Sequence, residues 1–225
     1  MSQSVLIIGA SRGLGLGLAQ AFAAQGWEVT ATVRDPRRAE ALQGAGQVAV
    51  ETLDMTDDAS VDALAARLEG RCFDVLFVNA GISAPQVDAV SETSRERVGE
   101  LFFTNAVAPV RLAERLLPNV KPEGVLAFMS SIMGSLETGT GMGKPLYSAS
   151  KAALNHLVRS FAKALPDGGP TILLMHPGWV RTDMGGDQAP LDVETSCRGM
   201  LQQVIQAAGQ GGHRYLDYQG NALPW

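Results

Sequence analysis

Cysteine is scarce in this chain, because only Cys72 and Cys197 occur among 225 residues. They form neither a CxxC pair nor a dense framework, so we expect reduced, structural thiols and no disulfide scaffold. The three histidines, His156, His176 and His213, are scattered, and none has a companion at the spacing of a metal site. The sequence therefore predicts no metal centre.

Long apolar runs and an excess of basic residues are missing too. No run reaches the roughly 18 to 20 apolar residues that cross a bilayer, and the N-terminus lacks the basic and apolar regions of a signal peptide. The formal net charge is -5, whereas nucleic-acid binding depends on concentrated Lys and Arg. We therefore expect a soluble cytoplasmic protein that has no membrane and no nucleic acid as a partner.

Apolar runs and amphipathic stretches alternate along the whole chain, and 46% of its residues are hydrophobic. Strands are expected near 4–8, 29–33, 73–78, 125–130, 171–175 and 213–216, with a further strand that ends near 53, and the main helices from the glycine-rich turn to about 24 and near 61–68, 94–117, 147–165 and 193–208. Parallel neighbouring strands need crossover helices that cover both faces of a sheet. The pattern predicts an α/β fold, with residues 1–225 forming one Rossmann-type domain around a doubly wound parallel sheet of about seven strands.

A glycine-rich turn follows the first predicted strand and opens a helical pattern. Glycine after the strand permits a tight turn, and small residues at the helix start let backbone N–H groups approach a pyrophosphate. We therefore predict a dinucleotide site that includes Gly9, Ser11, Arg12, Gly13, Leu14 and Gly15. The alternative is a turn that only brings strand and helix close together.

Arg34 follows the second predicted strand, where an acidic side chain would bind the ribose hydroxyls of NAD. Together with Arg12, its guanidinium is suited to clamp a 2′-phosphate. The sequence thus favours NADP, with NADPH preferred over NADH. In the alternative, Arg34 is a solvated surface charge and Asp35 binds the ribose.

Tyr147 and Lys151 stand one turn apart on the helix predicted at 147–165, and they project from one face. A nearby ammonium favours the phenolate, so we expect Lys151 to lower the pKa of Tyr147 toward the working range of a general acid or base. Ser130 and Ser131 end a strand upstream, at the sheet edge where open α/β folds bind ligands. A serine hydroxyl there can donate to a substrate carbonyl and stabilise developing negative charge. In isolation, the Tyr-x-x-x-Lys pattern also fits a plain pair on a helix surface.

These motifs, in this order, resemble the short-chain dehydrogenase/reductase family. The glycines at 9, 13 and 15 match its G-x-x-x-G-x-G turn, Asn79-Ala80-Gly81 ends the fourth strand, and Pro177-Gly178 follows the sixth. Val78 and Ile8 depart from residues that the family often has, and neither departure touches the chemistry. The likeness covers nearly the whole chain.

The resemblance implies a catalytic tetrad of Asn105, Ser131, Tyr147 and Lys151, with the second of the two serines as the match. In the family, such an asparagine kinks its helix and holds a water that links the lysine to solvent. The resemblance also assigns further positions to the cofactor, with Asp54 at the adenine: Asp54, Met55, Asn79, Ala80, Gly81, Pro177, Gly178, Val180 and Thr182.

Within the family, the residues 32–36, 177–184 and 215–225 are most similar to the C-factor and sniffer-like carbonyl reductase group. The expected activity is hydride transfer between NADP(H) and an aldehyde, ketone or quinone, or the corresponding alcohol. A nucleotide-binding signalling protein of C-factor type, with little turnover, is the alternative. The segment after Thr182 is too short for a large lid, so we expect an open pocket. A homodimer or homotetramer is a family expectation.

Overall fold

The computed structural model describes residues 3–44, 46–83, 90–139, 141 and 143–225. Within them, one seven-stranded sheet has the order β3-β2-β1-β4-β5-β6-β7, and each neighbouring pair is parallel. The strands are β1 (Ser4–Ile8), β2 (Glu28–Val33), β3 (Val48–Thr52), β4 (Phe73–Val78), β5 (Val120–Met129), β6 (Thr171–His176) and β7 (His213–Asp217). The strand order reverses between β1 and β4, so the predicted doubly wound sheet is confirmed.

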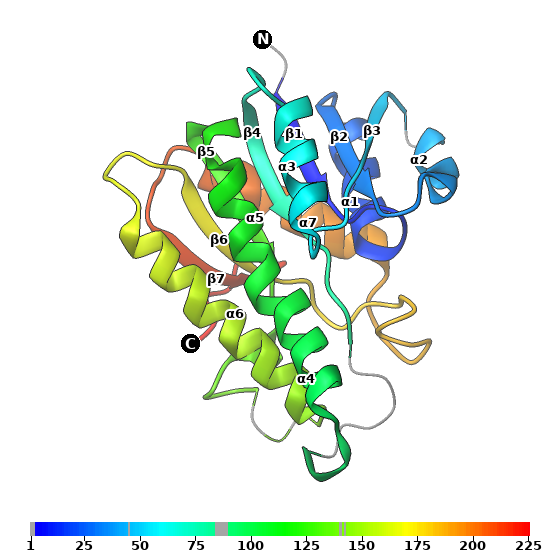
Figure 1. Cartoon of the computed structure of the whole chain (residues 1–225), viewed down its shortest axis with the longest axis vertical. Helices are drawn as coiled ribbons and strands as arrows, with labels where there is room; N and C mark the ends of the chain where they lie inside the picture. Colours follow the sequence, from blue (N-terminus) through cyan, green and yellow to red (C-terminus); the bar gives the residue numbers. More distant parts are fainter. Residues whose placement is uncertain (1–2, 45, 84–89, 140, 142) are drawn as a thin grey trace.

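Helices cover both faces of the sheet (Figure 1). They are α1 (Gly13–Ala24), α2 (Glu40–Gln43), α3 (Asp58–Arg67), α4 (Arg95–Phe102), α5 (Ala108–Leu116), α6 (Pro145–Ala164) and α7 (Val193–Ala207). One buried cluster joins the sheet to α3, α5 and α6, and a second joins it to α1 and α7. Alternate residues of β4 feed the two clusters, since Leu76 lies in the first and Phe77 in the second.

The helix predicted at 94–117 is interrupted, because a π-helical segment, Phe103–Val107, separates α4 from α5. Pro109, in the first turn of α5, has no N–H to donate to the carbonyl four residues earlier, which is that of Asn105. The wider turn therefore has a cause in the sequence, and Asn105, at which the resemblance implied a kink, is the middle residue of the π-helical segment. Other boundaries differ by a few residues: β5 begins at Val120 and α6 at Pro145.

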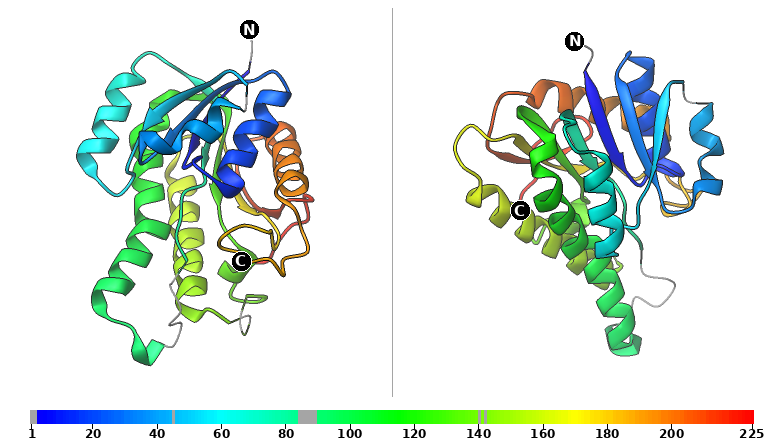
Figure 2. Two further views of the ribbon diagram at one scale, coloured as in Figure 1. Left: turned by 90° about the vertical axis from the view of Figure 1, so that its right-hand side faces the viewer. Right: turned by 45° about the horizontal axis from the view of Figure 1, so that its top comes forward.

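The carboxyl ends of the strands form the edge opposite the N-terminus (Figure 2). At this edge, α4 and the start of α6 project beyond the sheet, and the segments that follow β1, β4, β5 and β6 meet. Polar residues at the ends of strands far apart in the sequence are thereby brought into one place.

Candidate active site

Two glycines of the turn after β1, Gly9 and Gly15, have no room for a side chain. Gly9 has φ +85°, and a Cβ on it would lie 2.7 Å from the Cβ of Ala80. A Cβ on Gly15 would lie 2.0 Å from the carbonyl oxygen of Gly9, which accepts a hydrogen bond from Asn79 Nδ2 at 2.7 Å. No side chain among the described residues caps the start of α1 at Arg12. Its N–H groups and positive dipole end therefore face the cleft, as a pyrophosphate requires.

Arg34, directly after β2, lines the same cleft, and Asp35 does not. The carboxylate of Asp35 accepts hydrogen bonds from the Arg37 backbone N–H at 3.0 Å and from its guanidinium, and these bonds lower the pKa of Asp35. Asp54 accepts from the Thr56 hydroxyl at 2.6 Å, which is the main cause that holds its pKa below the usual value. This geometry favours Arg34 over Asp35 as the residue that meets the ribose end.

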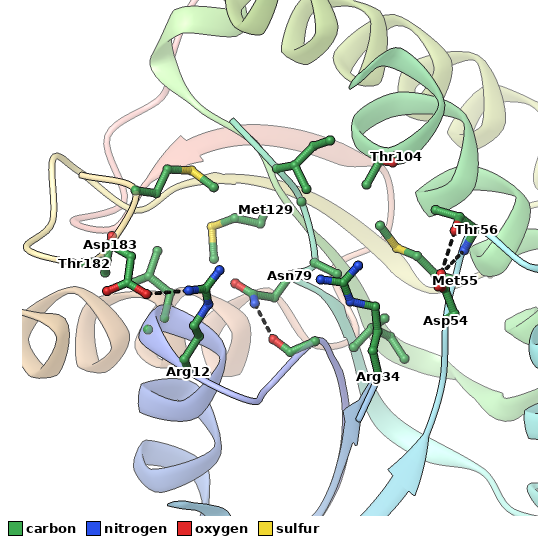
Figure 3. Close-up of a pocket in the computed structure, with 18 of the residues that line it drawn as sticks. Arg12, Arg34, Asp54, Met55, Thr56, Asn79, Thr104, Met129, Thr182 and Asp183 are labelled. Carbon is green, nitrogen blue, oxygen red and sulfur yellow. Dashed lines mark hydrogen bonds and ion pairs between the residues drawn. The ribbon is translucent and has the colours of Figure 1, made fainter. Parts of the chain in front are cut away.

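Arg12 is turned away from Arg34 (Figure 3). Its Nη1 lies 2.5 Å from Oδ2 of Asp183, in the segment after β6, and the two side chains are 66% and 74% exposed. The expected clamp of Arg12 and Arg34 is therefore not formed in this structure, because a carboxylate across the cleft attracts the first guanidinium. Both arginines nevertheless line one cleft.

Tyr147 and Lys151 lie at the other end of the cleft, on the first turns of α6. The Tyr147 hydroxyl hydrogen-bonds the side chain of Ser131. Lys151 is 3% exposed, and its Nζ lies 5.8 Å from the Tyr147 ring centroid and donates to the Met129 carbonyl at 2.9 Å. The structure thus brings together the three side chains for which the sequence predicted a shared role.

The two serines after β5 have different partners. Ser130 donates to Oδ1 of Asn155 at 2.6 Å inside the protein, whereas Ser131 faces Tyr147 and accepts from the Met133 N–H at 3.2 Å. The second serine, which the resemblance assigned to the tetrad, is therefore the one that faces Tyr147.

Asn105 is fully buried beside Lys151. Its amide exchanges two hydrogen bonds with the backbone of Ile82, both 2.8 Å, and donates a third to Ser150 Oγ at 3.1 Å. A Cβ on Gly81 would lie 3.2 Å from Asn105 Oδ1 and 3.5 Å from Lys151 Nζ, so Gly81 lies against both side chains.

Burial controls the proton affinities at this end of the cleft. It raises the pKa of Tyr147 to about 12, against which the hydrogen bond with Ser131 acts, and it lowers the pKa of Lys151 to about 8. The expectation that Lys151 lowers the pKa of Tyr147 does not hold for the chain by itself. Loss of solvent disfavours both charged forms and is the largest cause of both shifts.

The cleft collects most of the predicted cofactor positions. Those that line it are Gly9, Arg12, Gly13, Leu14, Arg34, Asp54, Met55, Asn79, Ala80, Gly81, Tyr147, Lys151 and Thr182. Those outside the lining are Ser11, Gly15, Pro177, Gly178 and Val180. Two of them have structural contacts: Gly15 makes room for the Gly9 carbonyl, and Val180 pairs with Leu191 as an isolated bridge.

Sequence reasoning missed several lining residues, namely Ile8, Thr56, Ile82, Thr104, Met129 and Asp183, and it favoured a packing role for Met184, which also lines the cleft. Thr56 had a local signal, since a hydroxyl two residues after Asp54 commonly bonds that carboxylate. Asp183 had none, because its partner Arg12 is 171 residues away.

Metal ligands do not gather in the described part of the chain, where no group of three or more His, Cys, Asp or Glu side chains is placed to hold an ion. Both cysteines are free, as expected of reduced thiols; Cys72 is exposed and Cys197 is buried. Burial lowers the pKa of His176 to about 4, which makes it neutral at pH 7. Among the described helices, none is long and apolar enough to span a bilayer.

Comparison with known proteins agrees with this geometry. The family model described as short chain dehydrogenase matches residues 3–191. A carbonyl reductase of Pseudomonas aeruginosa PAO1, solved in complex with NADP, is 46% identical with a TM-score of 0.93 and full coverage of both chains. The carbonyl reductase Sniffer of D. melanogaster is 31% identical, with a TM-score of 0.90 and full coverage of both chains. The C-signal of Myxococcus xanthus is 40% identical over 155 residues, which are 68% of this chain and 92% of that protein.

Proposed function

Because this chain belongs to the short-chain dehydrogenase family of oxidoreductases, we propose that it reduces a carbonyl compound with NADPH or performs the reverse oxidation. The observation that carries the proposal is that one cleft joins Tyr147 and Lys151 to the glycine turn and to Arg34. The substrate is a small aldehyde, ketone or quinone, since the hydroxyl groups at this site suit a single carbonyl oxygen.

The residues of the nucleotide end fit NADP. The glycine-rich turn and the uncapped start of α1 suit a pyrophosphate, and Arg34 presents a positive charge where a 2′-phosphate would stand. When bound, NADPH supplies the hydride that reaches the carbonyl carbon. Carbonyl reductases with bound NADP among the similar structures support this choice of cofactor.

Tyr147 supplies the proton in this proposal. With its pKa near 12, the phenol is fully protonated at pH 7 and is ready to donate to the carbonyl oxygen as negative charge develops there. Ser131, hydrogen-bonded to Tyr147, orients the same oxygen and shares its charge. Lys151 and the buried Asn105 then return a proton toward Tyr147 from solvent, as the resemblance implied.

The deciding experiment is a titration of the protein with NADPH and NADH by nicotinamide fluorescence, followed by absorbance decay with a panel of aldehydes, ketones and quinones. We expect tighter binding of NADPH and turnover of at least one carbonyl. Tighter binding of NADH would overturn the interpretation of Arg34.

A signalling protein is the second candidate, because the C-signal of Myxococcus xanthus is 40% identical to this chain. Binding of NADPH without turnover of any carbonyl in the panel would favour it. In both cases we propose a cytoplasmic location and a homodimer or homotetramer that forms through α4 and α6.

A further inference from the structure

Tyr215, on β7, is a buried tyrosine to which the proposed reaction assigns no role. It is 3% exposed and belongs to the cluster on the α6 face of the sheet. Its ring lies 5.5 Å from that of Trp225, at a tilt of 41°. Its hydroxyl donates a hydrogen bond to the backbone carbonyl of Ser131, 84 residues earlier in the chain. The residue whose peptide it holds is thus the serine that meets Tyr147.

The peptide of Ser131 is held on several sides. Its carbonyl also accepts from the Gly134 N–H at 2.8 Å, so both of the oxygen's lone pairs are used. Its Oγ accepts from the Met133 N–H at 3.2 Å and bonds Tyr147. Because Oγ is attached to the same residue, a rotation of this backbone would move the hydroxyl away from Tyr147.

Burial of the Tyr215 hydroxyl costs free energy, and packing alone does not explain why a hydroxyl is present at this position. Phenylalanine would fill the same space, whereas a buried hydroxyl is unfavourable unless it is hydrogen-bonded. Burial raises the pKa of Tyr215, and hydrogen bonds with Asn155 and Ser130 act in the opposite direction. The phenol therefore lies among groups that fix both serines at the end of β5.

We propose that Tyr215 is a positioning residue that fixes the backbone of Ser131 and thereby aims the serine hydroxyl at Tyr147 and the substrate oxygen. The proposal rests on the proposed function, in which Ser131 orients the carbonyl. Tyr215 itself touches neither the substrate nor the cofactor in this scheme and acts through Ser131.

Steady-state kinetics of Tyr215→Phe, alone and combined with Ser131→Ala, test this role. We expect the single change to lower kcat about 5- to 30-fold, with KM and the Kd for NADPH within about 2-fold of wild type. In the Ser131→Ala background the same change should cause no further loss, because the hydroxyl that Tyr215 aims is gone. An equal loss in both backgrounds would overturn the proposal.

Amide hydrogen exchange gives a readout that needs no turnover. In Tyr215→Phe, the amides of Met133 and Gly134 should exchange about 10-fold faster, since both donate to Ser131. The matched control is Thr171→Val, which removes a buried hydroxyl at the amino end of β6, where it donates to the Ala207 carbonyl and accepts from the Gly211 N–H, both at 2.8 Å, far along the strands from Ser131. It should change neither these amides nor kcat.

The outcomes separate the two proposals. Absence of turnover in the wild type counts against the proposed function, whereas the exchange experiment still examines the hold on Ser131. Unchanged exchange at Met133 and Gly134 in Tyr215→Phe overturns the positioning role. So does faster exchange with an unchanged kcat in an active enzyme.

Discussion

The cleft has a nucleotide end, at the glycine turn and Arg34, and a chemical end, at Tyr147 and Lys151. The two ends differ in how deeply their charged and polar groups are buried. Arg12, Arg34 and Asp183 are exposed, and the ion pair of Arg12 joins two surface side chains. At the chemical end, Lys151 and Asn105 are buried and have several hydrogen-bond partners inside the protein. Exposed pairs contribute about 0 to 1 kcal/mol, whereas loss of a buried polar partner costs about 1 to 3 kcal/mol. Single changes should therefore act strongly at the chemical end and weakly at the nucleotide end.

The largest loss of activity at the chemical end should come from Tyr147→Phe. The change removes the proton donor and keeps the ring, so we expect kcat to fall about 100-fold or more, with the Kd for NADPH within about 3-fold of wild type. Turnover and fluorescence titration of the same preparation measure both values. Retained activity would show that another group supplies the proton.

A pH-dependent effect on stability should follow from the burial of Lys151. Its pKa in the folded chain is about 8, below the usual 10.5, so the unfolded chain binds more protons between these values and stability rises with pH there. This difference in pKa corresponds to about 3 kcal/mol of unfolding free energy, which the folded protein gains as the pH rises from 8 to 10.5. The variant Lys151→Met has no ammonium at this position, so its stability lacks this dependence on pH.

Urea unfolding at pH 7 and pH 10 tests this prediction. The free energy of unfolding of the wild type, relative to that of Lys151→Met, should be higher at pH 10 than at pH 7. The reverse trend would mean that a partner holds the ammonium charged in the folded protein.

Arg34→Ala sharpens the comparison at the nucleotide end. If the guanidinium binds a 2′-phosphate, the Kd for NADPH should rise at least about 10-fold, since a charge-assisted hydrogen bond contributes about 1.5 to 3 kcal/mol. The Kd for NADH should stay within about 2-fold. Arg37→Ala, whose guanidinium pairs with Asp35, is the matched control and should change neither value. An equal rise in the Kd for NADPH and for NADH would show that Arg34 does not bind the 2′-phosphate.

The sequence predicted the two ends unequally well. Alternation of apolar runs and glycine chemistry are local signals, and they were sufficient for the sheet, the glycine turn and the pairing of Tyr147 with Lys151 in one cleft. Long-range contacts were not predictable, since the hold of Tyr215 on Ser131 and the pair of Arg12 with Asp183 depend on segments that only folding brings together. The direction of the Tyr147 pKa was wrong for a related reason: its burial is a property of the packed structure.

The smallest effect is expected from Asp183→Asn, which tests whether the ion pair with Arg12 opposes the cofactor. Releasing Arg12 should lower the Kd for NADPH about 2- to 5-fold, the range of an exposed ion pair, and affect NADH less. Asp187→Asn removes a negative charge from the same segment, where Asp187 is also exposed, and controls for overall charge. Equal tightening in both variants would assign the effect to net charge, and it should vanish for both near 0.5 M salt, as screening requires. Weaker binding of NADPH in Asp183→Asn alone would instead mean that Asp183 holds Arg12 over the bound dinucleotide, so that even this exposed pair would belong to the binding site.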